Sequence, residues 1–352
     1  MEHASSVLSE ALGDLKPEAP LASGRLTLLP LTLLPLTRTR PSKTRYVLLA
    51  TAIERGRLTV TEVSDGGSVP YLKATNKGPW PVLIFDGEEL IGAKQNRIMN
   101  TTILVGVGES ILPVSCVEQG RWSARSSAFA AGDWTSHPRL RREKESQVRC
   151  ALASLPDALG APELPQEVRA SHFRSDQGAV WQEVERHSRE LKVGSETGAM
   201  ADAYAGRAQD LESMVAAFGP ARSDAVAGEA AGAPTGAPGE VPVKGMAGVA
   251  VFLDGVFLCL DTLWSARRFR EIYPKLLRGY ALEALQAPPT KKVTSIDPET
   301  EVLRLFAELS AATPLERAGV DLGTDLRVET KTTLGAGLAL EGDMLQLSVF
   351  PR

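Results

Sequence analysis

Five polar side chains lie close together between two apolar runs: Lys94, Gln95, Asn96, Arg97 and Asn100. Asparagine is depleted in strands because its side chain competes for backbone hydrogen bonds, so two of them here are unusual for a solvated strand. Arginine offers a planar fork that fits phosphate or carboxylate, and lysine adds a point charge. This spacing predicts a site for an anionic or polyol ligand. A solvated bulge with surface cations is an equally good account.

Three more candidates follow, in the order Cys116, Glu118 and Arg121. Cys116 and Glu118 share one side of a predicted strand. We take both as candidate catalytic residues, since Arg121 could lower the thiol pKa, and we take Arg121 as a ligand-binding residue. The alternatives are a small core cysteine and an ion pair of Glu118 with Arg121 that closes the strand end over Trp122. We also expect Glu118 to be the carboxylate partner of Arg97 when no ligand is bound.

Asp86 is flanked by two further carboxylates, and such groups could do acid–base work or hold a hard cation. However, Asp-Gly is a turn signal, and the same dipeptide recurs at Asp254-Gly255 without neighbouring acids. We therefore interpret Asp86 as a turn residue. Glu88 and Glu89 point to opposite sides of a strand, so at most one of them can join a site.

Known motifs for metals and nucleotides are missing. Three distant cysteines and no CxxC or HxxxH pair argue against a structural zinc site, and we predict no bound metal. Gly106-Val-Gly108 lacks the third glycine of a dinucleotide fingerprint, and no P-loop pattern exists. The sequence leaves the cofactor unknown.

Charge and hydropathy narrow the class of protein. A formal net charge of −4 argues against a general affinity for nucleic acid. The strongest apolar run, Leu26 to Thr37, is too short to span a membrane and is interrupted by prolines, and its acidic leader is a poor signal peptide. The odd number of cysteines indicates reduced thiols. We expect a cytoplasmic protein without membrane association.

The apolar patterning predicts an α+β fold, an antiparallel β-sandwich built from N- and C-terminal strands with helices inserted between. X-Gly turns at Asp86, Asp254 and Glu341 predict hairpins. Leu26 to Thr37 is expected to be an edge strand, where proline is tolerated. Periodicity predicts helices over 139–155, 175–193, 201–218, 264–286 and 298–312. The expected organisation is a flexible tail (1–24) and a single domain (25–352), which is β-rich over 25–122, helical over 139–218, a flexible loop over 219–243 and β/α over 244–352.

The segments DGEELIGAKQNRIMNTTILV (86–105) and PVSCVEQGRW (113–122) resemble a bacterial family, the ARG (ADP-ribosylglycohydrolase) and rhodanese-phosphatase-superfamily-associated domains. Later segments over 249–262 and 276–285 are also similar, so the resemblance covers most of 25–351. It implies a link to ADP-ribose or other NAD-derived metabolites. It supplies no catalytic residues.

Two functions follow from these observations. The first is a domain that binds or processes a phosphorylated nucleoside metabolite such as ADP-ribose. The second is a non-catalytic scaffold whose polar stretch binds a protein partner. A ligand site needs the polar side chains to converge, whereas a scaffold would spread them over a flat face. Catalysis, substrate and oligomeric state stay open at this point.

Overall fold

Six antiparallel strands between Leu58 and Thr135 close into a β-barrel, in the order β11-β6-β5-β12-β8-β9. Alternate residues of these strands, such as Val60, Ala74 and Val114, point inward and form one apolar core. The computed structural model describes residues 2–34, 45–219, 241–286 and 297–352. The barrel strands are β5 (Leu58–Glu62), β6 (Tyr71–Asn76), β8 (Glu88–Gly92), β9 (Arg97–Met99), β11 (Gly108–Cys116) and β12 (Phe129–Thr135).

A small three-stranded sheet, β10-β7-β4, lies beside the barrel and shares its core. It consists of β4 (Val47–Leu48), β7 (Val82–Ile84) and β10 (Ile103–Val105), next to the short helix α2 (Leu49–Glu54).

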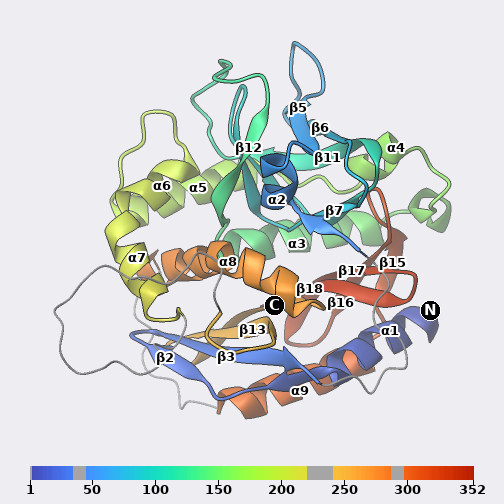
Figure 1. Cartoon of the computed structure of the whole chain (residues 1–352), viewed down its shortest axis with the longest axis vertical. Helices are drawn as coiled ribbons and strands as arrows, with labels where there is room; N and C mark the ends of the chain where they lie inside the picture. Colours follow the sequence, from blue (N-terminus) through green and yellow to red (C-terminus); the bar gives the residue numbers. More distant parts are fainter. Residues whose placement is uncertain (1, 35–44, 220–240, 287–296) are drawn as a thin grey trace.

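The second large unit is a nine-stranded sheet in which N- and C-terminal strands meet, because β3 pairs with β13 along its whole length. Helices α1 (Glu2–Gly13) and α9 (Pro298–Ala311) pack against one face of it (Figure 1). Its strands are β1 (Leu15–Pro17), β2 (Leu21–Ser23), β3 (Leu26–Leu33), β13 (Met246–Leu253), β14 (Val256–Leu263), β15 (Leu315–Ala318), β16 (Thr324–Glu329), β17 (Thr333–Leu340) and β18 (Asp343–Pro351).

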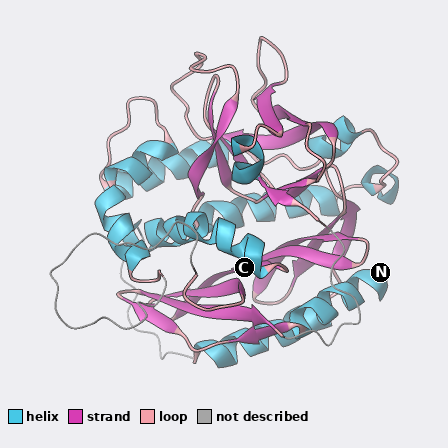
Figure 2. Cartoon of the chain, viewed as in Figure 1, coloured by secondary structure: helices cyan, strands magenta, loops and turns pink. Residues whose placement is uncertain are grey.

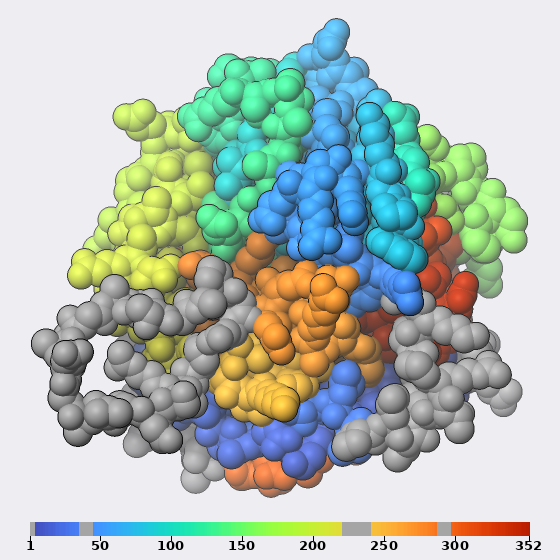
Figure 3. Space-filling model, in the orientation of Figure 1, coloured from blue at the N-terminus to red at the C-terminus, as the bar shows by residue number. Residues whose placement is uncertain are grey.

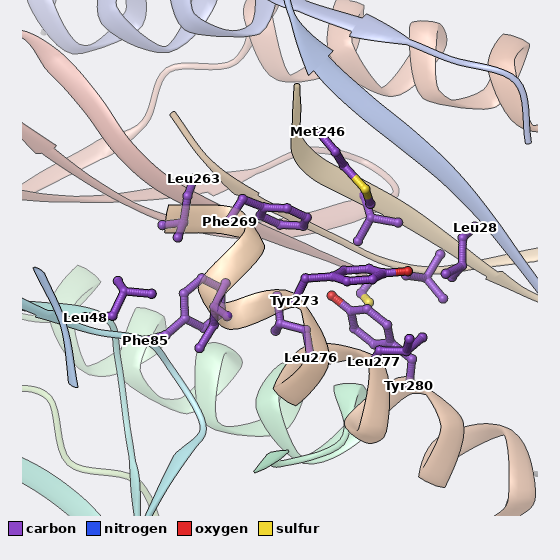
Figure 4. Packing of buried hydrophobic residues seen from close by; sticks show 14 of the residues in the cluster. Leu28, Leu48, Phe85, Met246, Leu263, Phe269, Tyr273, Leu276, Leu277 and Tyr280 are labelled. Atoms are coloured by element: carbon purple, nitrogen blue, oxygen red, sulfur yellow. The ribbon is translucent and has the colours of Figure 1, made fainter. Parts of the chain in front are cut away.

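Helices α3 (Pro138–Ala153) and α8 (Ala266–Gln286) lie between the barrel and the sheet (Figure 2). One face of α8 carries Phe269, Tyr273 and Leu276, which pack against Met246 of the sheet and against Phe85 on the barrel side (Figure 4). Each such side chain contributes about 1.5–3 kcal/mol when fully buried. Helix α8 therefore joins the two β units into one core.

The remaining helices are a 3₁₀ turn (Asp157–Gly160), α4 (Gln166–Ser171), α5 (Gln177–Leu191), α6 (Met200–Gly206) and α7 (Ala208–Ala216). Among them, α5, α6 and α7 form a chain of contacts and pack on α8, whereas α4 packs on β11 and the 3₁₀ turn contacts β15.

The α+β prediction is confirmed, but the sandwich is not what the strands form. The β-rich region closes on itself as a barrel, and only β1 to β3 of the N-terminal strands join the C-terminal ones. Inward and outward residues alternate along a strand in both architectures, so the sequence pattern does not distinguish them. The helices predicted over 139–155, 175–193, 264–286 and 298–312 are present, and the one over 201–218 is divided at Arg207.

Two of the three predicted hairpin turns are confirmed. Asp254-Gly255 links β13 to β14, and Glu341-Gly342 links β17 to β18, each with positive φ at both residues. The hairpin at Asp86 is wrong. Gly87 has a φ of 76°, as a turn requires, but β7 pairs with β10 and β4 whereas β8 pairs with β9 and β12. This turn passes the chain from one sheet to the other.

The N-terminal residues form α1, β1 and β2 in place of the expected tail, and they are held by burial of the apolar face of α1 against α9 and by pairing with β3. Strand β3 is not an edge strand. Pro30 lies between the part of β3 that pairs with β2 and the part that pairs with β1. Its carbonyl oxygen points to the β1/β2 side and accepts from the Glu18 N–H at 2.9 Å. The proline nitrogen, which has no hydrogen to donate, points to the same side, so no bond to β13 is lost. Most of the loop predicted over 219–243 lies outside the described residues.

None of the helices in the described ranges combines the length and apolar character needed to cross a membrane.

Candidate functional site

Strand alternation brings three polar side chains to one end of the barrel interior. Glu62 ends β5 in phase with buried Val60, and Arg97 begins β9 in phase with buried Met99. Cys116 ends β11 directly opposite Arg97 in the register. We call this end the barrel mouth, formed by Glu62, Lys94, Gln95, Arg97, Cys116 and Trp122.

Arg97 is fully buried and only partly hydrogen-bonded. Its Nη1 donates to the backbone oxygen of Gln95 at 2.9 Å and to Gln95 Oε1 at 3.3 Å. Its Nε and Nη2 find no hydrogen-bond partner in the described part of the chain. The Oε1 of Glu62 is 4.0 Å from Nη2, which is too far for a hydrogen bond. Burial lowers the pKa of Arg97, yet a guanidinium stays protonated in proteins, so a buried cation keeps unused donors.

Trp122 and Lys94 cover this guanidinium. The Trp122 ring centroid is 5.7 Å from Arg97 Cζ and 5.5 Å from Lys94 Nζ, within the range of a cation–π contact. Lys94 Nζ also donates to the carbonyl oxygen of Asp65 at 2.6 Å. Trp122 is 47% exposed, so the lid over Arg97 is itself open to solvent.

The loop after β5 closes over the same end. Gly67 has a φ of 75°, and a Cβ there would lie 3.1 Å from Lys94 Cδ and 3.4 Å from both Glu62 Oε2 and the Trp122 ring. This loop and the loop before β12 project side by side at the top of the molecule (Figure 3). The mouth is therefore enclosed by loops that emerge from the barrel.

Glu118 and Arg121 form the ion pair that the sequence suggests. Arg121 donates to Glu118 through Nε at 2.8 Å and Nη2 at 2.5 Å, and the Asn96 N–H and Thr197 Oγ complete the shell. Burial acts to raise the pKa of Glu118, but these bonds outweigh it and hold that pKa below its ordinary value. The side chain of Asn96 extends this network by donating to Glu89 at 3.1 Å.

The expected pairing of Arg97 with Glu118 is wrong. Asn96 and Arg97 are consecutive and face opposite sides, and Glu118 bonds on the Asn96 side. Arg97 is left with Glu62, which the sequence analysis missed. Its signal was a glutamate in phase with buried Leu58 and Val60 of a predicted strand.

The sequence model of the ARG and Rhodanese-Phosphatase-superfamily-associated Protein (ARPP-1) domain matches residues 19–350, which is nearly the whole chain. The chain belongs to this family. Apart from Glu62, the residues of the mouth and of its neighbouring ion pair lie in the segments that suggested the resemblance. No curated protein and no solved structure is significantly similar to the chain.

Cys116 has the properties of a core thiol. It is completely buried, and burial raises its pKa to about 11 although Arg97 acts in the other direction. A nucleophilic cysteine needs the opposite shift. As Glu118 is also saturated by its partners, neither candidate catalytic residue is poised for chemistry in this arrangement.

Asn100 lies apart from the mouth. Its Oδ1 accepts from Ser115 Oγ at 2.7 Å, and its Nδ2 donates to the carbonyl oxygen of Phe173 at 3.2 Å, which ties β9 to the segment after α4. Of the predicted ligand residues, Lys94, Gln95 and Arg97 gather at the mouth.

The acidic residues around the Asp86 turn are buried, and Asp86 and Glu88 form ion pairs with basic residues of α3 and α8. Asp86 accepts from Lys144 at 2.8 Å and Arg141 at 3.1 Å, and Glu88 accepts from Lys275 at 2.8 Å. Burial raises the pKa of Glu89 well above its ordinary value. Within the described ranges, three or more His, Cys, Asp or Glu side chains do not gather in a way that could hold a metal ion.

Proposed function

We propose that the barrel mouth binds the phosphate of a small phosphorylated nucleoside metabolite, with ADP-ribose as the first candidate. The observation that carries the proposal is the buried guanidinium of Arg97, whose Nε and Nη2 have no hydrogen-bond partner in the described structure. Leaving a buried polar group unsatisfied costs about 1–3 kcal/mol, and more when the group is charged. An anion that accepts from both donors would recover that cost.

Phosphate suits this position better than a point anion does. The Nε and Nη2 donors of a guanidinium lie on one side of the fork and match two oxygens of one phosphate. The protein leaves that pair unused while it engages Nη1 with Gln95.

The surroundings fit the remaining parts of a nucleoside. Trp122 offers a large, half-exposed ring on which a base can stack. Glu62 Oε2 has no hydrogen-bond partner in the described ranges and could accept from a ribose hydroxyl. For the ligand to reach Arg97, the Trp122 ring would have to move aside.

The family name associates its members with ADP-ribosylglycohydrolases, which favours an ADP-ribose-related ligand over other phosphates. A scaffold for a protein partner would spread its polar side chains over an exposed face, whereas Gln95, Arg97 and Cys116 converge in the barrel and are buried. We propose binding in the cytoplasm and assign no reaction.

The test is a thermal-shift comparison of ADP-ribose, ADP and ribose 5-phosphate, followed by isothermal titration of the stabilising compound. Arg97→Lys keeps the charge and most of the stem but removes the fork, so it should weaken binding by about 1–3 kcal/mol, or about 5- to 150-fold.

Arg25→Lys is the matched control. The fork of Arg25, unlike that of Arg97, is already bound bidentately by Asp254 in the turn between β13 and β14, so Arg25→Lys should affect stability and leave affinity unchanged. If no compound stabilises the protein, or if Arg97→Lys binds as tightly as the wild type while folded, the proposal fails.

A further inference from the structure

An open groove of about 670 Å³ runs between α3 and α5 and is lined by arginines from three elements. They are Arg139, Arg142 and Arg149 of α3, Arg186 of α5, and Arg352 next to the end of β18. The same lining contains two carboxylates, Glu143 and Glu183. Glu190 and Glu329, outside the lining, pair with three of the five arginines, so the groove keeps a small positive excess in a protein whose formal net charge is −4. This groove is separate from the barrel mouth and shares no residue with it.

Helices α3 and α5 run antiparallel along the two sides of the groove. The backbone N–H of Asp176, just before α5, donates to Gln147 in the second half of α3, and Glu183 further along α5 lies 3.9 Å from Arg139 at the start of α3. Arg139 and Arg149 are ten residues apart on α3, or about 15 Å along the helix axis. The groove is therefore elongated, with arginines at both ends.

At each end of the groove two arginines share a glutamate. At one end Glu183 pairs with both Arg139 and Arg186, and Arg186 also pairs with Glu190 at 2.6 Å. At the other, Glu329 lies 2.6 Å from Arg149 and 3.1 Å from Arg352. At the Glu329 end one carboxylate cannot neutralise two guanidinium groups, so this end keeps a positive charge, whereas at the other end Glu183 and Glu190 balance Arg139 and Arg186.

Arg142 stands between these ends and is the least engaged of the five. It makes no hydrogen bond and no ion pair with another described residue, and its side chain is half-buried beside Glu143. Arg142 lines the groove, so its guanidinium is available to a ligand there.

We infer that this groove binds a linear polyphosphate anion of three or more linked phosphate groups. The volume lies in the range of small-molecule sites, which favours a compact ligand over a macromolecule. Arginine recognises phosphate through its planar fork, and guanidinium groups at three positions along the groove suit a chain of phosphates better than a single one. Free tripolyphosphate and the triphosphate of a nucleotide share this chemistry.

The experiment is isothermal titration of the full chain with sodium tripolyphosphate, and separately with ATP without added metal. Arg142→Gln should weaken tripolyphosphate binding about tenfold or more, because it removes a charge-assisted contact. Arg352→Gln tests the far end with a side chain that is 58% exposed, so folding is not at risk. Equal losses for tripolyphosphate and ATP would identify the phosphate chain itself as the ligand, whereas a loss for ATP alone would overturn that assignment.

Arg189→Gln is the matched control, since Arg189 is also on α5 but is exposed outside the groove and pairs with Glu185. It should leave the affinity unchanged, as should Arg97→Lys at the barrel mouth. If tripolyphosphate does not bind the wild type, or if Arg142→Gln and Arg189→Gln have the same effect, the inference is overturned. Weaker tripolyphosphate binding in Arg97→Lys alone would move the site to the mouth.

Discussion

Two arginines, Arg141 and Arg97, are both completely buried, and they differ in how fully they are bonded. Arg141 of α3 donates to Asp261 through Nη1 at 2.8 Å and Nη2 at 2.7 Å, and its Nε donates to Asp86 at 3.1 Å. Its Cζ also lies 5.2 Å and 5.1 Å from the ring centroids of Phe85 and Phe350. Arg97 uses Nη1 alone.

The pKa values of the two arginines are shifted in opposite directions. Burial acts to lower the pKa of Arg141, but Asp261 outweighs it and the pKa rises well above its ordinary value. At Arg97 burial prevails and the pKa falls. A saturated buried cation is part of the structure that joins barrel to sheet. An unsaturated one is better explained by a partner from outside the chain.

The largest expected effect is a difference in the free energy of unfolding between variants of Arg141 and Arg97. Arg141→Met should destabilise the protein by about 3–5 kcal/mol, because Asp261 and Asp86 lose a buried partner. Arg97→Met should change the free energy of unfolding by less than about 1 kcal/mol or raise it, since it removes a desolvated cation with unused donors. Urea unfolding of both variants measures the difference. Similar losses would show that Arg97 is as structural as Arg141.

A smaller effect concerns Glu89, a single titrating group behind the mouth. Because burial raises its folded-state pKa, the neutral carboxyl is favoured in the folded protein, and its contribution to stability is lost as pH rises from the unfolded pKa through the folded one.

Glu89→Gln keeps the acceptor for Asn96 and removes this titration. We expect the variant to gain stability relative to wild type as pH increases from 4 towards neutral, measured by urea midpoints at each pH. A difference that does not change with pH would contradict a buried neutral Glu89.

The smallest effect is expected at Cys116. Cys116→Ala should cost about 1 kcal/mol for the small cavity, measured by thermal or urea unfolding. In the native protein a thiol reagent should modify exposed Cys150 at neutral pH and leave Cys116 unreacted, because its pKa is about 11. Rapid labelling of Cys116, measured in the Cys150→Ala variant, would contradict the assignment of Cys116 as a core thiol and support a nucleophilic role.

Local sequence patterns predicted the helices over 139–155, 175–193, 264–286 and 298–312 and two hairpins, because periodicity and X-Gly turns are short-range signals. Barrel closure was not predictable in this way, since it depends on pairing between distant strands such as β12 and β5. The partner of Arg97 was missed for the same reason: Glu62 is 35 positions away and adjacent only once the barrel closes.

The burial of charged residues in α3 could not be predicted from the local composition of the helix. Residues 138–147 read PRLRREKESQ, which is typical of a solvated helix face, yet Arg141, Lys144 and Glu145 are buried. The partner of Lys144 is Asp86, before the helix, and the partners of Arg141 and Glu145 are Asp261 of β14 and Arg327 of β16, more than a hundred residues later. Charge runs indicate exposure only when no opposite charge arrives from elsewhere in the fold.

The claim that Arg97 keeps its donors for a phosphate is tested most directly by nitrogen-15 NMR of arginine side chains. Arg97→Lys assigns the Arg97 Nε–H signal by its disappearance, and the wild type is then titrated with ADP-ribose. The account predicts that this signal moves to a new, slowly exchanging position with ligand, while that of Arg141, assigned through Arg141→Lys, stays in place. An Arg97 signal that does not change at saturating ADP-ribose would contradict it.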